Sequence, residues 1–156
     1  MPLGGPSMSK ESVGSTKYLN VDLDIYSNRD LEPLVSALGN KVHVLFIGKH
    51  KRTYEAHLEA GRYPEPKNPN AAIRDFCKLI LDLPEDERKV WDSAKIRQFD
   101  IGIEAGTEPQ TYRFEIAPEI VKQASVLNAR IAVTIYPPDR SEKLQELRAA
   151  KDAIGG

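Results

Sequence analysis

Residues 18–25 read Tyr-Leu-Asn-Val-Asp-Leu-Asp-Ile, a stretch in which apolar and polar side chains alternate. The apolar residues share one phase of the stretch: Leu19, Val21, Leu23 and Ile25. Because successive side chains of a β-strand point to opposite faces, a period of two places each phase on its own face. The stretch therefore predicts a strand with one buried and one polar face, as in antiparallel sheets that keep one side in water.

Helical periodicity recurs outward from this strand. The first helix follows directly, with apolar residues from Leu31 to Leu38, and ends at Gly39, a typical helix stop. Three more helices are predicted over residues 71–81, 85–94 and 118–127, and prolines open the last two. The amphipathic pattern is strongest in 71–81.

Strand patterns fill the intervals between these helices. They cover residues 42–48, 54–60, 99–103, 112–116 and 131–135. The stretch 42–48 is nearly all apolar, as expected of an interior strand, and the basic segment Lys49 to Arg52 turns it into 54–60 as a hairpin. We expect a second hairpin between 99–103 and 112–116, across a Gly-Thr-Glu-Pro turn.

This order of elements indicates an α+β fold. The first six elements match a ferredoxin-like plan, so we expect a ferredoxin-like or related mostly antiparallel sheet with helices packed on one face. Residues 17–138 form the single α+β domain of this interpretation. A disordered leader at 1–16, rich in Gly, Ser and Pro, precedes it, and a helix-prone tail at 139–156, with Leu144 and Leu147 as its apolar anchors, follows it.

The composition limits the classes of partner. Lys and Arg number 22 against 23 Asp and Glu, a formal net charge of -1, so no global field attracts nucleic acid or an anionic membrane. No apolar run reaches the roughly 18 residues that a membrane span needs. The single cysteine, Cys77, excludes an internal disulfide. We expect a cytoplasmic protein with no nucleic-acid or membrane partner.

Carboxylates gather in the polar phases of two predicted strands. Asp22 and Asp24 share one face of the first strand, and Asp100 and Glu104 occupy the matching phase of a later one. Adjacent strands could assemble them into a cluster of the kind that binds Mg²⁺ in nucleases. The alternative is a solvated, acidic sheet face, which we favour because no basic track accompanies the carboxylates.

Other chemistry-bearing residues give weaker signals. His43, His50 and His57 are spaced by seven, but no carboxylate or cysteine stands near them at metal-ligand spacing, so we expect surface or hydrogen-bonded histidines and no metal site. Cys77 lies in an apolar stripe and is predicted to pack in the core. No Gly-rich phosphate loop or catalytic elbow is present, and no cofactor is predicted.

Three segments, 18–25, 99–106 together with Trp91, and 131–138, resemble a widespread family of uncharacterised small bacterial α+β proteins. The resemblance extends from Tyr18 to Pro138. Proteins of this general kind are often suspected to be immunity proteins, which block a toxin made by the same or a rival cell. The resemblance therefore implies a cognate, toxin-like protein partner.

The leading hypothesis is a non-enzymatic protein-binding module, an immunity or inhibitor protein that neutralises a bacterial toxin. Its predicted partner-binding residues are Asp22, Asp24, Tyr26, Asp100 and Glu104, because charged and aromatic groups together supply steering and contact area. Two alternatives stay open. One is a metal-dependent hydrolase or nuclease that uses Asp22, Asp24 and Asp100, and the other is a small-molecule sensor with a pocket under the helices.

Overall fold

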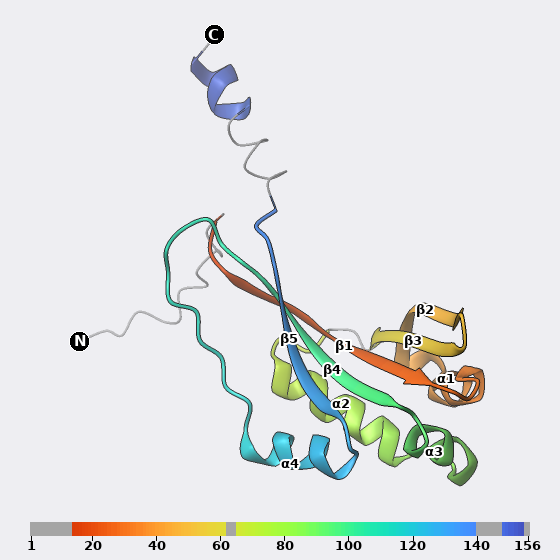
Figure 1. Cartoon of the computed structure of the whole chain (residues 1–156). Coiled ribbons are helices and arrows are strands. Elements are labelled where there is room, and N and C mark those ends of the chain that lie inside the picture. The colour runs from red at the N-terminus through yellow and green to blue at the C-terminus, as the bar shows by residue number, and fades with distance from the viewer. Residues whose placement is uncertain (1–13, 62–64, 140–147, 155–156) are drawn as a thin grey trace.

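The structure, a computed structural model, describes residues 14–61, 65–139 and 148–154. Its strands are β1 (Lys17–Ser27), β2 (Val42–His50), β3 (Thr53–Ala60), β4 (Ile96–Glu104) and β5 (Arg130–Tyr136). They form one sheet in the order β2-β3-β1-β4-β5 (Figure 1). The β2–β3, β3–β1 and β1–β4 pairs are antiparallel, and only β4–β5 is parallel. The sheet is therefore mixed but mostly antiparallel.

Four helices cover one side of this sheet (Figure 1). They are α1 (Glu32–Leu38), α2 (Pro69–Leu81), α3 (Glu85–Asp92) and α4 (Pro118–Val126), and a short 3-10 turn, η1 (Gly39–Lys41), follows α1. The longest, α2, has a well-formed N-terminus: the Asn68 side chain accepts a hydrogen bond from the Ala71 N–H, and Pro69 occupies the first turn. Residues 148–154 are also helical, and all of them are exposed.

The core lies between the sheet and these helices. It contains Val21, Leu23 and Ile25 of β1, the buried stripe of α2, and Trp91 of α3, whereas Leu19 is 41% exposed. Trp91 is fully buried, and its indole N–H donates to the Leu127 carbonyl over 3.1 Å. This bond fastens α3 to the end of α4. Phe76 and Phe99 stack with ring centroids 6.0 Å apart and join α2 to β4.

Most predicted elements are confirmed. The alternating stretch 18–25 lies within β1, and the four predicted helices correspond to α1 to α4. Gly39 caps α1 with a positive φ of 60°, a conformation that favours glycine. Cys77 is buried, as predicted, and burial raises the pKa of its thiol to about 11, so the thiol is unreactive at neutral pH.

The predicted strand 112–116 and its hairpin with 99–103 are wrong. Residues 105–117 contain neither helix nor strand. The Asn70 side chain fixes this segment: it donates to the Glu115 carbonyl and accepts from the Ala117 N–H, both over 2.8 Å. Phe114 and Ile116 pack against the core from this loop. The alternation of apolar and polar residues in 112–116 thus belongs to a half-buried loop. After this loop, the chain runs through α4 and returns to the sheet as β5, which pairs parallel to β4.

The prediction that 42–48 is an interior strand is also wrong, because β2 lies at an edge of the sheet. Val44, Leu45 and Phe46 are 46–51% exposed, and the pairing register shifts between Val44 and Phe46. The mixed, five-stranded sheet, with β5 added parallel to β4, also departs from the predicted ferredoxin-like plan. The coarser prediction, an α+β fold with a mostly antiparallel sheet and helices on one face, is confirmed.

Two predictions concern parts of the chain at its ends. Residues 1–13 of the predicted leader lie outside the described residues, and so do Leu144 and Leu147 of the predicted tail. Within the described ranges, no helix combines the length and the apolar character required to cross a lipid bilayer.

Candidate partner-binding face of the sheet

The helices leave the other side of the sheet uncovered (Figure 1). Because Val21, Leu23 and Ile25 of β1 point into the core, the alternate residues point away from the helices. We call this surface the open face. Its members on the five strands are Asn20, Asp22, Asp24, Tyr26, Phe46, Glu55, His57, Glu59, Gln98, Asp100, Gly102, Glu104, Arg130, Thr134 and Tyr136.

The structure brings four of the five predicted partner-binding residues together near the middle of the open face. Asp22 pairs with Asp100 on β4, Asp24 is two residues along β1, and Tyr26 follows it. Glu104 lies on the same face but at the far end of β4, where its carboxylate forms an ion pair with Lys17 over 3.3 Å. Glu104 is therefore separate from the central group.

Three carboxylates stand in one row across the sheet. Glu59, Asp22 and Asp100 occupy directly opposed positions on β3, β1 and β4. Like charges in opposed positions repel. Burial, followed by the nearby carboxylates of Glu59, Asp24 and Asp100, raises the pKa of Asp22 to about 6. Proton binding or a nearby cation relieves this repulsion.

The neighbouring row centres on Asp24, the most buried carboxylate of the face at 8% exposure. One of its oxygens lies 2.7 Å from His57 Nδ1, and the other accepts from the Gln98 amide over 3.1 Å. His57 Nε2 faces Glu55 at 3.5 Å. Two carboxylate neighbours require two N–H donors, so this geometry fits the charged imidazolium.

The pKa of His57 agrees with that assignment. Burial lowers this pKa, but the hydrogen bonds and charges of Asp24 and Glu55 outweigh burial, and the net shift is upward. A histidine with both ring nitrogens facing carboxylates has no free lone pair for general-base chemistry. His57 therefore lies among carboxylates that favour its positively charged form.

Amide and hydroxyl groups bind the carboxylates of the first row, Glu59, Asp22 and Asp100. Asn20 donates to Asp22 over 3.1 Å and to Glu59 over 2.9 Å. The Thr134 hydroxyl lies 2.7 Å from Asp100 Oδ1, which it reaches from β5. Gly102 leaves room for Asn20, because a Cβ atom at this position would lie 2.9 Å from the Asn20 side-chain oxygen. The result is two sets of hydrogen bonds within this row, one between β3 and β1 and one between β4 and β5.

Aromatic rings border these rows. The ring of Tyr26 meets His57 edge-on with centroids 5.6 Å apart, and the ring of Phe46 lies 6.0 Å from His57 on the β2 side. Tyr136 lies at the β5 margin and is largely exposed, as is Phe46. Exposed aromatic rings beside charged groups are typical of protein interfaces.

The metal-site alternative finds no support in this geometry. In the parts of the chain that are described, no group of three or more His, Cys, Asp or Glu side chains is arranged to hold a metal ion. Both oxygens of Asp24 accept hydrogen bonds, and those of Asp100 face Thr134. His43 lies opposite Glu59, away from the ring of His57.

Sequence reasoning missed the contribution of β3. Glu55, His57 and Glu59 alternate along this strand, which marks them as one face, but nothing in the sequence aligns that face with Asp22 and Asp24. The β1–β3 register does so by pairing His57 with Asp24. A periodicity signal was thus present, and the missing information was which strands are neighbours.

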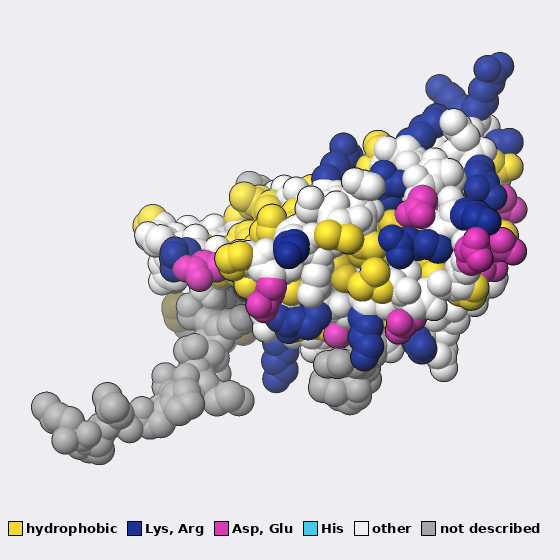
Figure 2. Space-filling model, turned by 90° about the horizontal axis from the view of Figure 1, so that it is seen from below, with side chains coloured by type: hydrophobic (Ala, Val, Ile, Leu, Met, Phe, Trp, Pro, Cys, Tyr) yellow, Lys and Arg dark blue, Asp and Glu magenta, His cyan; other side chains and the backbone are white. Residues whose placement is uncertain are grey.

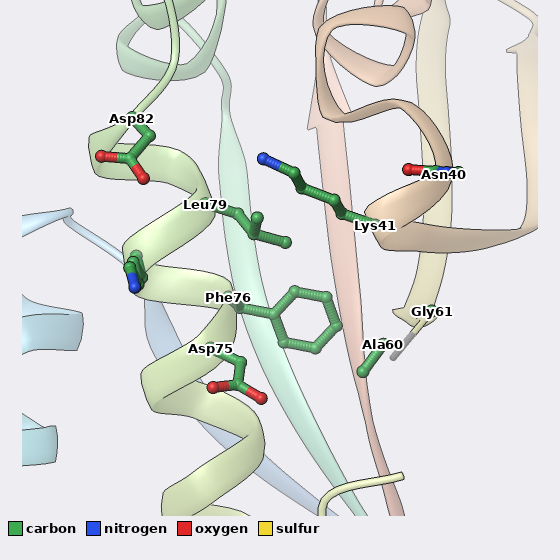
Figure 3. A pocket seen from close by; sticks show the side chains of 9 residues that line it. Asn40, Lys41, Ala60, Gly61, Asp75, Phe76, Leu79 and Asp82 are labelled. Atoms are coloured by element: carbon green, nitrogen blue, oxygen red, sulfur yellow. The ribbon is translucent and has the colours of Figure 1, made fainter. Parts of the chain in front are cut away.

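A cleft lies on the opposite, helical side (Figure 3). Its volume is about 390 Å³, and it opens between α2 and the end of β3. Phe76, Leu79 and Ala60 form an apolar floor, and Lys41 and Asp82 stand at its rim. This size falls at the lower end for small-molecule sites.

The helical side has a different charge pattern from the open face. Figure 2 shows Lys and Arg side chains distributed over this side, interspersed with Asp and Glu and with apolar groups. Several of these charges form ion pairs, such as Arg74 with Glu119 and Arg88 with Asp92. On the open face, by contrast, the carboxylates of Glu59, Asp22 and Asp100 occupy directly opposed positions on neighbouring strands.

Comparison with known proteins finds no family model, no curated protein and no solved structure that matches this chain.

Proposed function

We propose that this chain is a non-enzymatic protein-binding module that presents its open face to a basic surface of a partner protein. The observation that supports the proposal is the row of Glu59, Asp22 and Asp100, held side by side at the centre of an uncovered sheet. A cationic group of a partner placed over this row would gain several charge-assisted hydrogen bonds.

The cost of this arrangement argues for a function. An ordinary solvated sheet face avoids opposed like charges, yet here the pKa of Asp22 rises to about 6 by burial and by neighbouring carboxylates. Local arrangements that oppose stability concentrate at functional sites. A lysine or arginine of the partner would offset the repulsion between these carboxylates. Binding of the partner would therefore stabilise the folded chain.

A more specific form of the proposal is an immunity or inhibitor protein. A toxin that acts on nucleic acid needs a cationic active-site surface to hold phosphates. The open face, with its carboxylates and bordering tyrosines, would cover such a surface and exclude the substrate. This form follows from the family resemblance of residues 18–138 and adds the kind of partner to the general proposal.

Neutral, shape-preserving substitutions test the proposal. A partner is first identified by cross-linking and mass spectrometry, and its affinity is then measured by calorimetry at low and high salt. We expect Asp22→Asn with Asp100→Asn to weaken binding about tenfold at low salt and less at high salt, because screening reduces charge attraction.

The matched control is Glu85→Gln with Asp86→Asn on α3, which removes the same formal charge from the helical side. Binding of this control should stay within about twofold of the parent, as expected of residues outside the interface. If both double variants weaken binding equally, net charge and not the open face decides recognition, and the proposal fails.

A second candidate function is small-molecule sensing in the cleft beneath α2. The observation in its favour is the 390 Å³ cleft itself, with Phe76 and Leu79 at its floor. Leu79→Trp should fill the cleft. If a ligand panel raises the melting temperature of the parent but not of Leu79→Trp, the sensor function is favoured over the protein-binding function.

A further inference from the structure

Among the described residues, no strand pairs with the outer edge of β5. The sheet order ends at β5, so no described strand lies on its outer side (Figure 1). Natural edge strands usually carry proline, lysine or a bulge that discourages pairing. The sequence of β5, Arg-Ile-Ala-Val-Thr-Ile-Tyr, has no proline, glycine or lysine, and its register with β4 is regular. The other edge, β2, contains Gly48, Lys49 and a register shift.

The backbone groups available at this edge can be identified. The Tyr136 carbonyl accepts a hydrogen bond from the Ala105 N–H over 2.9 Å, so the backbone of Tyr136 faces β4. Hydrogen-bonding direction alternates along a strand in a parallel pair. The N–H and C=O groups of Ile131, Val133 and Ile135 therefore point outward, away from β4.

The side chains at the same positions are apolar; Ile131 packs partly against the core, and the other two are poorly covered. Val133 is 48% exposed and Ile135 is 67% exposed. Their β4 partners, Ile101 and Ile103, are buried in the core on the helical side of the sheet. Val133 and Ile135 thus extend an apolar surface out to the edge, where it meets water. Residues 148–154 are themselves exposed throughout and do not bury it.

We propose that β5 is a homodimerisation edge: a second copy of this chain pairs with it antiparallel, about a two-fold axis through Val133. Val133 then pairs with Val133 of the second copy, and the two chains exchange both backbone hydrogen bonds there. Ile131 pairs with Ile135 on either side of the axis. These three pairs use every outward-facing backbone group of the strand and join two sheets of five strands into one.

The pairing suits a second copy because β5 is self-complementary. A two-fold interface places the same strand on both sides, so each residue must be compatible with its symmetry partner. About Val133, apolar residues face apolar residues, Ala132 faces Thr134, and the only charged residue, Arg130, faces the ring of Tyr136. No like charges meet. Pro137 and Pro138 end the strand and fix the length of the paired segment.

The test begins with sedimentation of the full chain over a concentration series. We expect a reversible dimer. Val133→Lys should raise the dissociation constant at least about tenfold, because the two-fold axis sets two lysines opposite each other. Leu45→Lys, at the β2 edge and similarly exposed, is the matched control and should dimerise like the parent. Circular dichroism confirms that both variants fold.

A cross-link locates the axis. In this pairing the Cα atoms of residue 133 lie about 5.5 Å apart, within the range of a disulfide. Val133→Cys should form a disulfide-linked dimer under mild oxidation, whereas Leu45→Cys should not. The native Cys77 is buried and contributes no background.

Three outcomes would overturn the proposal. One is a parent chain that remains monomeric at about 200 µM, far above the dissociation constants of stable dimers, which would leave the edge to a peptide or to the chain's own C-terminal residues. Another is a dimer that survives Val133→Lys. The third is equal behaviour of the residue 133 and residue 45 variants in dissociation or in cross-linking.

Discussion

The two faces of β1 are built from alternate residues of the same strand and follow different rules. Leu23 and Ile25 are fully buried beneath the helices, and they contribute by excluding water and filling space. Asp22 and Asp24, one position away from them, lie among carboxylates, amides and His57. The helical face therefore supplies stability, whereas the open face keeps charges together at some cost to stability. Substitutions on the two faces should separate these roles.

The largest change in the free energy of unfolding is expected from a substitution on the helical face of β1. Leu23→Ala should lower the free energy of unfolding by about 3–4 kcal/mol, because it removes a fully buried side chain and leaves a cavity. Urea denaturation followed by circular dichroism measures the change. Leu19→Ala, in the same strand but partly exposed, is the control and should cost less than about 1 kcal/mol. Equal costs would show that β1 is not anchored through one face.

A smaller loss of stability is expected from a substitution at the centre of the open face. Asp24→Ala should cost about 2 kcal/mol, because it leaves the His57 and Gln98 donors without their acceptor. The pKa of His57, measured by NMR titration, should fall in this variant, since Asp24 supplies the main upward contributions. An unchanged His57 pKa would contradict the assignment of the imidazolium.

Neutralising the acidic row should instead stabilise the protein. The pKa of Asp22 is about 6 in the folded chain against 3.8 for an ordinary aspartate, so its contribution to stability is present below about pH 4 and is lost as the pH rises through 6. Asp22→Asn should therefore add about 1 kcal/mol at pH 7.5, after allowance for solvent screening, and nothing at pH 4. Thermal unfolding at the two pH values measures this difference.

His57 also makes the folded chain less stable as the pH rises. Its folded pKa is raised above the ordinary 6.5, so its stabilising contribution is full below pH 6.5 and declines as the pH rises through the folded value. The parent should thus be more stable near pH 5.5 than near pH 8. A melting temperature that rises between these pH values would refute the acidic network as described.

The smallest effect is expected on the helical surface. Arg74→Ala removes the ion pair with Glu119, in which both side chains are more than half exposed. Exposed ion pairs contribute little because water and salt screen them, so the change should be below about 0.5 kcal/mol. A loss comparable to that of Asp24→Ala would remove the contrast between isolated surface pairs and the connected network.

Local sequence patterns predicted where the helices and strands lie better than they predicted which strands are adjacent in the sheet. The period of two in 18–25 and the apolar stripe in 71–81 each specify one element, because the signal is contained within the segment. Residues 112–116 also alternate, but Asn70, more than forty residues away in sequence, holds them as a loop. The position of β2 at the edge depends on the order of all the strands in the sheet, and the apolar sequence of β2 does not indicate it.

The candidate site was predictable to the same degree. The shared phase of Asp22 and Asp24 placed them on one face, and the assumed adjacency of the 99–103 strand brought in Asp100, which β4 confirms. The roles of His57 and Glu59 depend on the register between β1 and β3. This register is set by the turns and by the pairing of the strands in the folded chain. Sequence thus predicts which residues share a strand face and does not predict which strands are neighbours.

The hydrogen bond from Trp91 to Leu127 gives the molecule a built-in optical reporter. Trp91 is the only tryptophan of the chain, and its indole is buried in the core with its N–H bound to the carbonyl of Leu127, the residue that caps the C-terminus of α4. Its emission should be blue-shifted in the folded chain and should shift red when water reaches the ring. Because α4 leads directly into β5, the wavelength of one residue would report whether the last helix and strand are docked, separately from the rest of the sheet.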